Sequence, residues 1–328
     1  MSEPKSLPSF ADVDLAAQRI KGVAVRTPLI NAPVLDERLG ARVFLKAETL
    51  QRTGSFKFRG AYNKISSIPA DKRAGGVVAY SSGNHAQGVA AAARLLRMRA
   101  TIVMPSDAPL AKRRRTEALG AEVVAYDRVR EDRAAIAHKI AEERGATLVP
   151  PYDDPLIVAG QGTIGREIAE DLAALDLRPE LVLIGASGGG LAAGVALGLK
   201  ARVPDAVMYT VEPEAFDDTR RSFASGRREK NEQLSGSICD ALLTATPGEV
   251  TFPINSRLIG QGVTVSDEEV AAAVRFAFEE LKLVVEPGGV VGLAAMLAGK
   301  VDLRGRIVVG VLSGGNVDAA LFAKLIVA

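Results

Sequence analysis

The sequence has 328 residues, with 41 Lys and Arg against 39 Asp and Glu, a formal net charge of +2 and a hydrophobic fraction of 48%. These values predict a soluble globular protein with core enough for two domains, and the near balance of charge gives no sign of a nucleic-acid or membrane partner. Cys239 is the only cysteine, which excludes an internal disulfide and is typical of a reducing compartment. With no signal-peptide pattern at the amino terminus, a cytoplasmic location is expected.

A helix is expected over residues 11–21 and a strand over 42–46, ahead of the segment Thr53-Gly54-Ser55-Phe56-Lys57-Phe58-Arg59-Gly60. The threonine and the serine of this segment are predicted to cap a helix whose first turn carries Lys57. A cation at this end of a helix opposes the helix dipole. A lysine that forms an imine with a carbonyl cofactor is neutral and removes the conflict. An ordinary surface lysine is the alternative, and the segment alone does not decide between them.

A pattern of β-branched strand, glycine-containing loop and Ala/Leu-rich helix occurs three times. The three copies are expected over 77–80, 81–85 and 86–96, over 181–184, 185–190 and 191–200, and over 307–312, 313–316 and 317–326. Strands that alternate with helices predict an α/β fold with mostly parallel, doubly wound sheets and with ligands at the carboxyl ends of the strands. The three loops are therefore expected to face one crevice.

The stretch between the first and second copies predicts a separate unit. Further strands are expected over 100–104 and 122–126, and the prolines at 150–151 interrupt any regular element after them. We therefore predict a small inserted domain of residues 76–151. The large cofactor-binding domain would then consist of residues 1–75 and 152–328.

The middle glycine loop allows two interpretations. Gly188-Gly189-Gly190-Leu191-Ala192-Ala193 satisfies the pattern G-x-G-x-x-A, and Glu212 follows near the distance expected of a ribose-binding acid, which allows a nicotinamide-dependent oxidoreductase. Free amides before a helix, however, indicate only that an anion, most often a phosphate, binds there. The mid-chain position of the loop and the lack of a hydride-transfer residue in the other two loops disfavour a dinucleotide.

A phosphorylated aldehyde cofactor needs a lysine, a phosphate cradle, a donor for its phenolic oxygen and a partner for its pyridine nitrogen. Asn84 in the first loop offers an amide, and Ser313 in the third offers a hydroxyl. Each has an ordinary alternative, because Asn84 suits a helix cap and Ser313 suits a turn. Their coincidence with Lys57 and the glycine loop favours the cofactor.

Three segments carry a specific resemblance that covers nearly the whole chain. Ser55-Phe56-Lys57-Phe58-Arg59-Gly60, Ser81-Ser82-Gly83-Asn84-His85-Ala86-Gln87-Gly88 and Leu312-Ser313-Gly314-Gly315-Asn316 resemble the serine/threonine dehydratase and serine racemase family of pyridoxal-phosphate enzymes, fold type II. The resemblance implies two doubly wound open sheets with the cofactor in the cleft between domains. The cofactor-binding residues that it implies are Phe56 on the ring, Lys57 in the imine, Asn84 at the phenolic oxygen, Ser187, Gly188, Gly189, Gly190 and Leu191 at the phosphate, and Ser313 at the pyridine nitrogen.

The resemblance also implies catalytic and substrate-binding residues. Lys57 would remove the α-proton, and Ser82 matches the serine with which racemases protonate Cα from the opposite face, so racemisation is an expected side activity. Arg133 lies close to where racemases have an arginine for the second carboxylate of dicarboxylic ligands, and a surface ion pair is its alternative. His85 is expected to be a hydrogen-bonded loop residue rather than a general base. The cradle for the substrate carboxylate is formed by Ser81, Ser82, Gly83, Asn84 and His85.

A divalent-cation loop is implied directly after a strand expected over 207–211. The ligands that match the family are Glu212, the backbone carbonyl of Phe216 and Asp218. Carboxylate and carbonyl oxygens suit Mg²⁺ or Ca²⁺. The alternative is a solvated acidic turn.

The reaction expected from this resemblance is an α,β-elimination that converts threonine, serine or 3-hydroxyaspartate into a 2-oxo acid and ammonia, carried out by a homodimer. Two departures from the common pattern leave the substrate open. Ser187 begins the phosphate loop in place of a glycine, and Ala241 stands where many members have glycine next to the cofactor. A nicotinamide-dependent oxidoreductase and a non-catalytic ligand-binding module are the alternatives from other classes.

Overall fold

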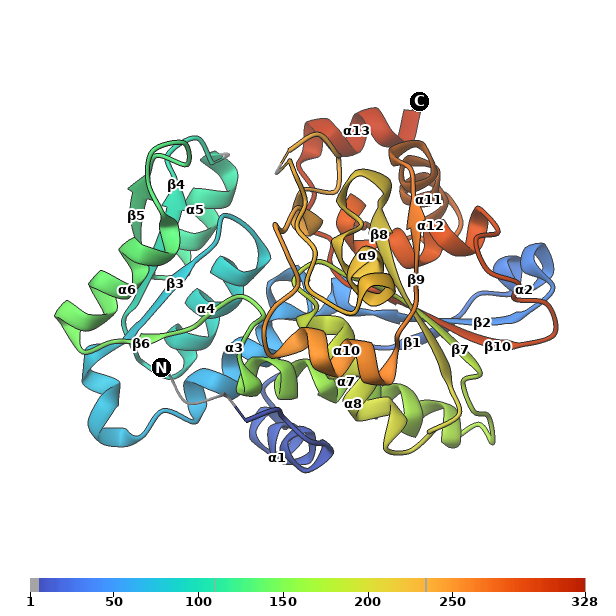
Figure 1. The fold of residues 1–328 in the computed structure, drawn as a ribbon, viewed down its shortest axis with the longest axis horizontal. Coiled ribbons are helices and arrows are strands. Elements are labelled where there is room, and N and C mark those ends of the chain that lie inside the picture. The colour runs from blue at the N-terminus through green and yellow to red at the C-terminus, as the bar shows by residue number, and fades with distance from the viewer. Residues whose placement is uncertain (1–5, 109, 234, 328) are drawn as a thin grey trace.

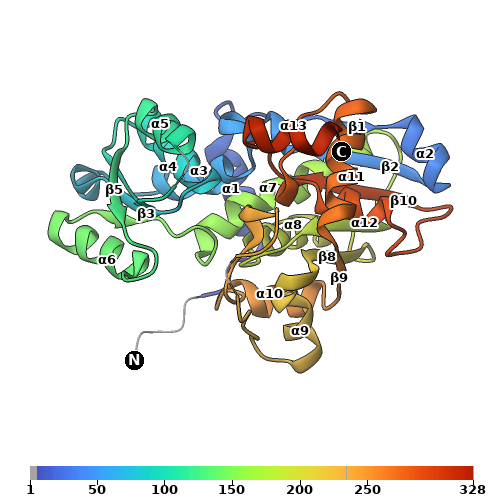
Figure 2. The same ribbon diagram turned by 90° about the horizontal axis from the view of Figure 1, so that it is seen from above.

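The chain folds into two α/β lobes that lie side by side (Figure 1), and a view from above shows the same division (Figure 2). The computed structural model describes residues 6–108, 110–233 and 235–327. None of the helices in these ranges has the length and apolar character needed to span a bilayer. The expected α/β class and the mostly parallel sheets are confirmed.

The larger lobe is built on a six-stranded sheet. Its strands are β1 (Leu29–Asn31), β2 (Arg42–Ala47), β7 (Leu181–Gly185), β8 (Val207–Pro213), β9 (Gly262–Val265) and β10 (Ile307–Leu312). They lie in the order β1-β2-β10-β7-β8-β9. The edge strand β1 runs antiparallel to β2, and the other neighbours pair in parallel, so that β2, β7, β8 and β10 end at one edge of the sheet.

Helices cover both faces of this sheet. The helices of the larger lobe are α1 (Phe10–Ile20), α2 (Pro33–Leu39), α7 (Pro155–Ala173), α8 (Gly190–Lys200), α9 (Asp218–Ser225), α10 (Thr251–Leu258), α11 (Asp267–Glu279), α12 (Val291–Leu297) and α13 (Ala319–Val327). Val43 and Leu183 share one core with residues of α2, α11, α12 and α13, whereas the next residues along the strands, Phe44 and Ile184, share another with α7 and α8. This alternation is that of a doubly wound sheet.

The smaller lobe contains a four-stranded parallel sheet. Its strands are β3 (Val77–Tyr80), β4 (Ala100–Pro105), β5 (Glu122–Tyr126) and β6 (Thr147–Leu148), and its helices are α4 (Asn84–Leu95), α5 (Leu110–Ala118) and α6 (Arg133–Arg144). The strand order is β5-β4-β3-β6. Val77 and Ala79 face α4, whereas Val78 faces α6 on the opposite side, so this sheet is also covered on both faces.

Short 3₁₀ turns connect several of these elements. They are η1 (Glu48–Leu50), η2 (Arg52–Gly54), η3 (Ala70–Gly75), η4 (Glu214–Phe216), η5 (Asp240–Leu242) and η6 (Pro287–Gly289).

Helix α3 (Lys57–Ser66) lies where the two lobes meet. Its Phe58, Ala61 and Ile65 belong to the core of the four-stranded sheet, while the same helix packs against α7 of the larger lobe. The division at residues 76 and 151 stays a prediction. Because α3 precedes residue 76 and still shares the core of the smaller lobe, the two units are interlocked at the lysine helix.

The start of α3 differs from the expectation. The helix begins at Lys57 behind Phe56, which makes no side-chain cap bond, so the prediction that Thr53 and Ser55 cap it is wrong. Thr53 instead adopts φ 60° and Ser55 is extended. Within the described residues, both hydroxyl oxygens are buried without a hydrogen-bond partner. Helix α4 likewise begins at Asn84, which is therefore its first residue and not its cap.

Candidate active site

The three strand-end loops meet in one pocket between the lobes, as the sequence predicts. Parallel strands bring their carboxyl ends to one edge of a sheet, and β3, β7 and β10 all end at this pocket. The residues expected to bind cofactor or substrate all line it: Phe56, Lys57, Ser81, Ser82, Gly83, Asn84, His85, Arg133, Ser187, Gly188, Gly189, Gly190, Leu191 and Ser313.

Lys57 enters this pocket from the first position of α3. Its Nζ donates a hydrogen bond to the carbonyl oxygen of Pro151 at 2.8 Å and lies 5.0 Å from the centroid of the Phe56 ring. Burial lowers the pKa of Lys57 to about 8, against an opposing effect of Glu286. A larger share of the amine is therefore neutral near pH 7 than in a solvated lysine, which suits a nucleophile or a base. An ordinary surface lysine does not have these surroundings.

The glycine loop before α8 forms a cradle from which side chains are excluded. Gly189 has φ 86° and is the N-cap of α8, and a Cβ on it would lie 2.6 Å from Asn255 Nδ2. A Cβ on Gly188 would lie 2.4 Å from ring atoms of Tyr152. Backbone amides at the amino end of a helix attract anions. The loop therefore fits a cofactor phosphate.

Ser187, which replaces the first glycine of the family pattern, adds a hydroxyl to this cradle. It does not have the positive φ that would favour glycine, so a side chain is tolerated there. Its hydroxyl contacts that of Thr244, which also lines the pocket. Two hydroxyl groups therefore stand beside the glycine loop.

Asn84 is held in one orientation by two partners. Its Oδ1 accepts a hydrogen bond from Asn316 Nδ2 at 2.7 Å, and its Nδ2 donates to Glu286 Oε1. Asn316 is itself fixed, because the same Nδ2 donates to the carbonyl oxygen of Thr53 at 2.7 Å. An amide nitrogen has two N–H groups. The second N–H of Asn84 is therefore left for an acceptor such as a phenolic oxygen.

Ser313 follows the last residue of β10 and ties that strand to the lysine segment. Its backbone carbonyl accepts from the amide of Phe56 at 3.1 Å, and its own amide donates to the carbonyl of Gly289 at 3.0 Å. The residue is 7% exposed and lines the pocket. A hydroxyl so placed suits a neutral partner for a ring nitrogen.

The loop after β3 presents a compact polar turn at the amino end of α4. The hydroxyl of Ser81 accepts from the amide of Gly83 at 3.2 Å. His85 is buried, and its Nε2 pairs with the carbonyl oxygen of Val149 at 2.8 Å. Burial, with a contribution from Lys57, lowers the pKa of His85 to about 3, so its imidazole is neutral. The contacts agree with a hydrogen-bonded loop residue rather than a general base.

Arg133 is the first residue of α6 and lines the pocket from the smaller lobe. Its guanidinium carbon lies 5.6 Å from the centroid of the Tyr80 ring. Arg133 forms no ion pair with another described side chain. Oδ1 of the neighbouring Asp132 caps α6 by accepting from the amides of Ala134 and Ala135. The alternative of a surface ion pair is therefore not what the structure contains.

The acidic loop after β8 lies outside this pocket, and its Glu212, Phe216 and Asp218 are buried. Glu212 accepts from the amides of Thr219 and Arg220, each at 2.9 Å, and Asp218 Oδ1 accepts from Asn231 Nδ2 at 2.6 Å. Asp218 Oδ2 is buried with no hydrogen-bond partner among the described residues. Glu212 and Asp218 are therefore shielded from solvent, although Glu214 of the same turn is exposed.

Burial and the nearby Asp218 raise the pKa of Glu212 to about 8, and burial raises that of Asp218 to about 7. Few hydrogen-bond donors contact the buried carboxylates of Glu212 and Asp218. A cation bound between them would stabilise their negative charges. The described residues hold no group of three or more His, Cys, Asp or Glu side chains able to bind a metal. A site here would therefore also need the backbone carbonyl of Phe216 and water.

Several pocket residues could not be recognised from the sequence. Glu286, Tyr152 and Thr244 line the pocket although each is far in sequence from the motif that it contacts. The run Glu286-Pro287-Gly288-Gly289 is typical of a tight turn, and this is the signal that the sequence offers for Glu286. Ala241 lines the pocket as expected, and a Cβ on Gly288 would lie 3.1 Å from its methyl group.

Two doubly wound sheets, a lysine with a lowered pKa in the pocket between them and a glycine cradle at a helix amino end define a pyridoxal-phosphate enzyme of fold type II. The family model described as "Pyridoxal-phosphate dependent enzyme" matches residues 20–314. The chain belongs to this family, which decides between pyridoxal phosphate and the nicotinamide cofactor that the glycine loop alone allowed.

Known relatives lie within the serine/threonine dehydratase and serine racemase group. The chain is 48% identical over 320 residues to the L-threo-3-hydroxyaspartate ammonia-lyase of Pseudomonas sp. This alignment covers 98% of this chain and 99% of that protein. It is 39% identical over 326 residues to the serine racemase of Schizosaccharomyces pombe, with 99% of each chain covered. Among solved structures, the maize serine racemase matches with a TM-score of 0.91 at 32% identity, covering 97% of each chain.

Proposed function

We propose that the protein is a pyridoxal-phosphate-dependent ammonia-lyase that converts a β-hydroxy amino acid into a 2-oxo acid and ammonia, and that its preferred substrate is 3-hydroxyaspartate. The observation that carries the substrate is Arg133, a cation that lines the pocket without an ion-pair partner among the described residues. A guanidinium binds a carboxylate through two parallel hydrogen bonds. The 48% identity to an L-threo-3-hydroxyaspartate ammonia-lyase supports the same substrate.

The residues that we propose to hold the cofactor all line this pocket, which supports their roles. Lys57 would bind it covalently, Phe56 would pack on its ring, and the loop from Ser187 to Leu191 would hold its phosphate. Asn84 would donate to the phenolic oxygen, and Ser313 would face the ring nitrogen. Bound pyridoxal phosphate supplies an electron sink for negative charge at the substrate Cα.

Lys57 is also the base of the proposed reaction. With a pKa of about 8, its amine accepts a proton from Cα without a large penalty, and the pocket holds it beside that atom. Lys57 would return that proton to the β-hydroxyl, which leaves as water when the Cβ–O bond breaks. A later water molecule would break the C–N bond, which gives the 2-oxo acid and ammonia. The overall reaction needs no oxidant or reductant. The cradle from Ser81 to His85 orients the α-carboxylate at the amino end of α4.

Ser82 gives the same pocket a second proposed activity. It lines the pocket as a hydroxyl that, by the match to racemases, stands on the face of the cofactor opposite Lys57. Return of a proton to Cα from that face inverts the configuration. We therefore propose racemisation of serine as a side activity, which the resemblance to the Schizosaccharomyces pombe serine racemase supports.

We further propose that Mg²⁺ or Ca²⁺ binds to Glu212, the carbonyl of Phe216 and Asp218, supported by the unpartnered buried oxygen of Asp218.

We also propose that the protein is a homodimer and that its location is cytoplasmic. The edge-to-face rings of Phe278 and Phe322 and the 48% exposed Val284 give an apolar surface that suits a second copy. Sedimentation of the purified protein at several concentrations tests the dimer.

The experiment that tests the substrate is an ammonia-release assay with serine, threonine and both diastereomers of 3-hydroxyaspartate. Replacing Arg133 with Ala is expected to lower kcat/KM for 3-hydroxyaspartate by roughly 100-fold while changing that for serine only slightly, because serine has no second carboxylate. Arg130→Ala is the matched control, since Arg130 is 85% exposed and pairs with Asp127. An equal loss for serine and 3-hydroxyaspartate in Arg133→Ala would contradict the assignment.

A further inference from the structure

The first turn of α3 carries Lys57, yet no side chain among the described residues caps the helix. Phe56 stands at the N-cap position without a side-chain cap bond. The direction in which Lys57 points depends on how the helix is rotated about its axis. The backbone bond from the Phe56 amide to the Ser313 carbonyl holds the end of the helix at one point, so a second contact is needed to fix that rotation.

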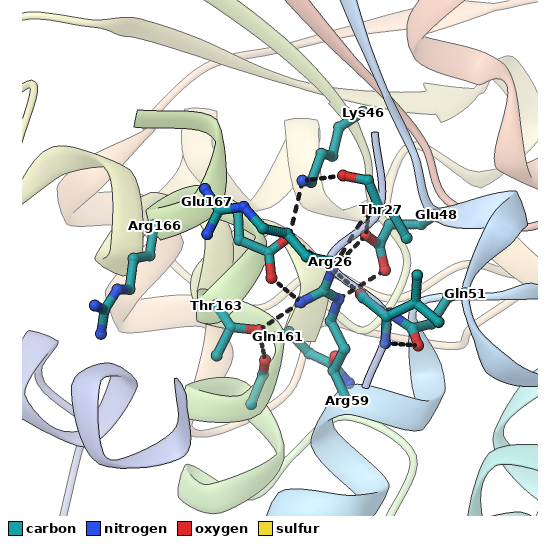
Figure 3. Close-up of polar contacts among 12 residues, drawn as sticks. Arg26, Thr27, Lys46, Glu48, Gln51, Arg59, Gln161, Thr163, Arg166 and Glu167 are labelled. Atoms are coloured by element: carbon teal, nitrogen blue, oxygen red, sulfur yellow. Dashed lines mark hydrogen bonds and ion pairs between the residues drawn. The ribbon is translucent and has the colours of Figure 1, made fainter. Parts of the chain in front are cut away.

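Arg59 makes such a contact two residues after Lys57 (Figure 3). It is fully buried, and its guanidinium lies between two carboxylates. Nε and Nη2 donate to Glu48 at 2.8 Å each, while Nη1 and Nη2 donate to Glu167 at 2.7 and 2.9 Å. Nη1 also donates to Thr163 Oγ1 at 3.1 Å. All five N–H groups of the side chain are thereby used, which a lysine with three donors could not reproduce.

The two carboxylates belong to elements of the larger lobe. Glu48 follows β2, and Glu167 lies on α7, where it also pairs with Lys46 Nζ at 2.8 Å. Lys46 is fully buried as well and donates to the carbonyl of Thr27 at 2.7 Å. Burial alone would lower the pKa of Arg59, but the two carboxylates raise it above its ordinary value. The group is therefore a permanently charged anchor.

Helical geometry places this anchor behind the lysine. Successive residues of an α-helix are turned by about 100°, so Lys57 and Arg59 point to nearly opposite sides of α3. Two close backbone contacts hold the helix in between. A Cβ on Gly160 of α7 would lie 2.5 Å from the Cα of Gly60, and a Cβ on Gly88 of α4 would lie 3.2 Å from the backbone carbonyl carbon of Lys57. These close backbone contacts on both sides restrict how far α3 can slide between α4 and α7.

The energetics favour a positional role over one in stability. Taking charges out of water is so unfavourable that replacing a buried ion network by apolar residues of similar volume is often neutral or stabilising. An ionic cluster is directional, however, because each carboxylate fixes the plane of the guanidinium. We propose that Arg59, held by Glu48 and Glu167, is a positioning residue that sets the direction of Lys57 in the pocket. This inference rests on the proposed function of Lys57 as the cofactor-binding base.

The test is Arg59→Lys in the holoenzyme, which keeps the charge and loses the two-sided geometry. A displacement of about 1 Å can lower a rate by about 100-fold. We expect kcat to fall 10- to 100-fold with KM changed less than about threefold. Two further readouts concern Lys57 itself: slower capture of added pyridoxal phosphate by the cofactor-free protein, and a shifted pH midpoint of the absorbance of the bound cofactor. A residue with only a structural role would change neither in protein that is folded at the assay temperature.

The matched control is Arg26→Lys. Arg26 belongs to the outer part of the same network, where its half-exposed guanidinium pairs with Glu170 and Asp171. The Arg26→Lys variant is expected to leave kcat, the rate of cofactor capture and the pH midpoint of the absorbance unchanged. Glu48→Gln, which keeps the volume and one acceptor, serves as the second variant if Arg59→Lys does not fold, and it should reproduce the fall in kcat and the shifted pH midpoint.

Normal kcat, capture rate and pH midpoint in a folded Arg59→Lys or Glu48→Gln protein would overturn the positioning role. Failure of the proposed function gives a different result. In that case borohydride reduction of the wild-type holoenzyme fixes no cofactor on Lys57, and Lys57→Ala remains active.

Discussion

Glu286 is a pocket residue whose titration should be visible in the stability of the whole protein. It is 5% exposed and accepts a hydrogen bond from Asn84, and burial raises its pKa to about 7 from an ordinary 4.5. A carboxyl whose pKa is raised on folding contributes stability that is fully present below its unfolded pKa. That contribution is lost as the pH rises through the folded pKa. The relevant window is therefore between pH 4.5 and about 7.

Glu286→Gln should remove this pH dependence because an amide does not titrate and still offers Asn84 an acceptor. Relative to the wild type, the variant is expected to gain about 1–3 kcal/mol of stability between pH 5 and pH 8.5. Thermal or urea unfolding of both proteins at the two pH values measures the gain. The exposed Glu279→Gln is the control, and a difference between variant and wild type that does not change with pH would contradict the expectation.

At this scale the sequence reveals residues that lie in motifs and misses those that reach the pocket by packing. Lys57 and Asn84 each begin a helix and Ser313 directly follows a strand, and at these places residue type and position together suggest a role. Glu286 accepts a hydrogen bond from Asn84, which lies 202 residues earlier in the sequence. A contact of this kind depends on the packing of two separate segments, which no local pattern contains.

Secondary-structure elements follow the sequence closely where the hydrophobic period is clear. The strands over 77–80 and 307–312 are found at their expected bounds, and α4 begins at Asn84 instead of residue 86. The start of α3 could not be predicted from hydroxyl-bearing residues. Its amino end is fixed by the amide of Phe56 donating to the carbonyl of Ser313, a bond to a strand from the other end of the chain.

The loop between β8 and α9 shows how one element can influence another. The hydroxyl of Thr219 donates to the carbonyl of Ser187 at 3.4 Å, and Asn231 Nδ2 bridges Asp218 to the carbonyl of Thr244 at 2.8 Å. Ser187 and Thr244 stand at the proposed phosphate cradle. An ion bound to the carboxylates would therefore stiffen both ends of that cradle.

We expect Mg²⁺ or Ca²⁺ to raise the unfolding temperature and to slow the loss of pyridoxal phosphate on dilution, and EDTA to reverse both effects. A free cation concentration of 100 times the dissociation constant adds about 2.7 kcal/mol to the free energy of unfolding. Asp218→Asn should abolish the response, whereas Glu214→Gln, an exposed side chain of the same loop, should retain it. An unchanged cation response in Asp218→Asn would place the ion elsewhere.

At the scale of the whole molecule, the α/β architecture follows from three repeated strand-loop-helix units, but the way in which the lobes are joined does not. Helix α3 packs with one lobe and is bonded to the other, and its contacts with α4 and α7 depend on glycines 60, 88 and 160. A close approach of two backbones has no sequence signature beyond the glycine itself. The placement of Lys57 between the lobes is therefore visible only in three dimensions.

An ion pair between α5 and η5 joins the two lobes at the pocket and should affect substrate binding more than stability. Lys112 of α5 and Asp240 of η5 both line the pocket, and Lys112 Nζ lies 2.6 Å from Asp240 Oδ2. Because the Asp240 side chain is 57% exposed, the pair adds little to the free energy of unfolding. Its loss would let the lobes separate more easily and release substrate faster.

Lys112→Ala is expected to raise KM several-fold for serine and 3-hydroxyaspartate alike, to remove most of the dependence of KM on salt, and to change the unfolding temperature by less than about 2 °C. Steady-state kinetics at 0.05 and 0.5 M NaCl provide the measurement. Arg113→Ala is the matched control, since Arg113 lies next on α5 and pairs with Glu117 of the same helix. If both variants raise KM equally, general electrostatic attraction of the anionic substrate is the cause. An effect confined to Lys112, and equal for substrates with one and two carboxylates, would identify the link between the lobes.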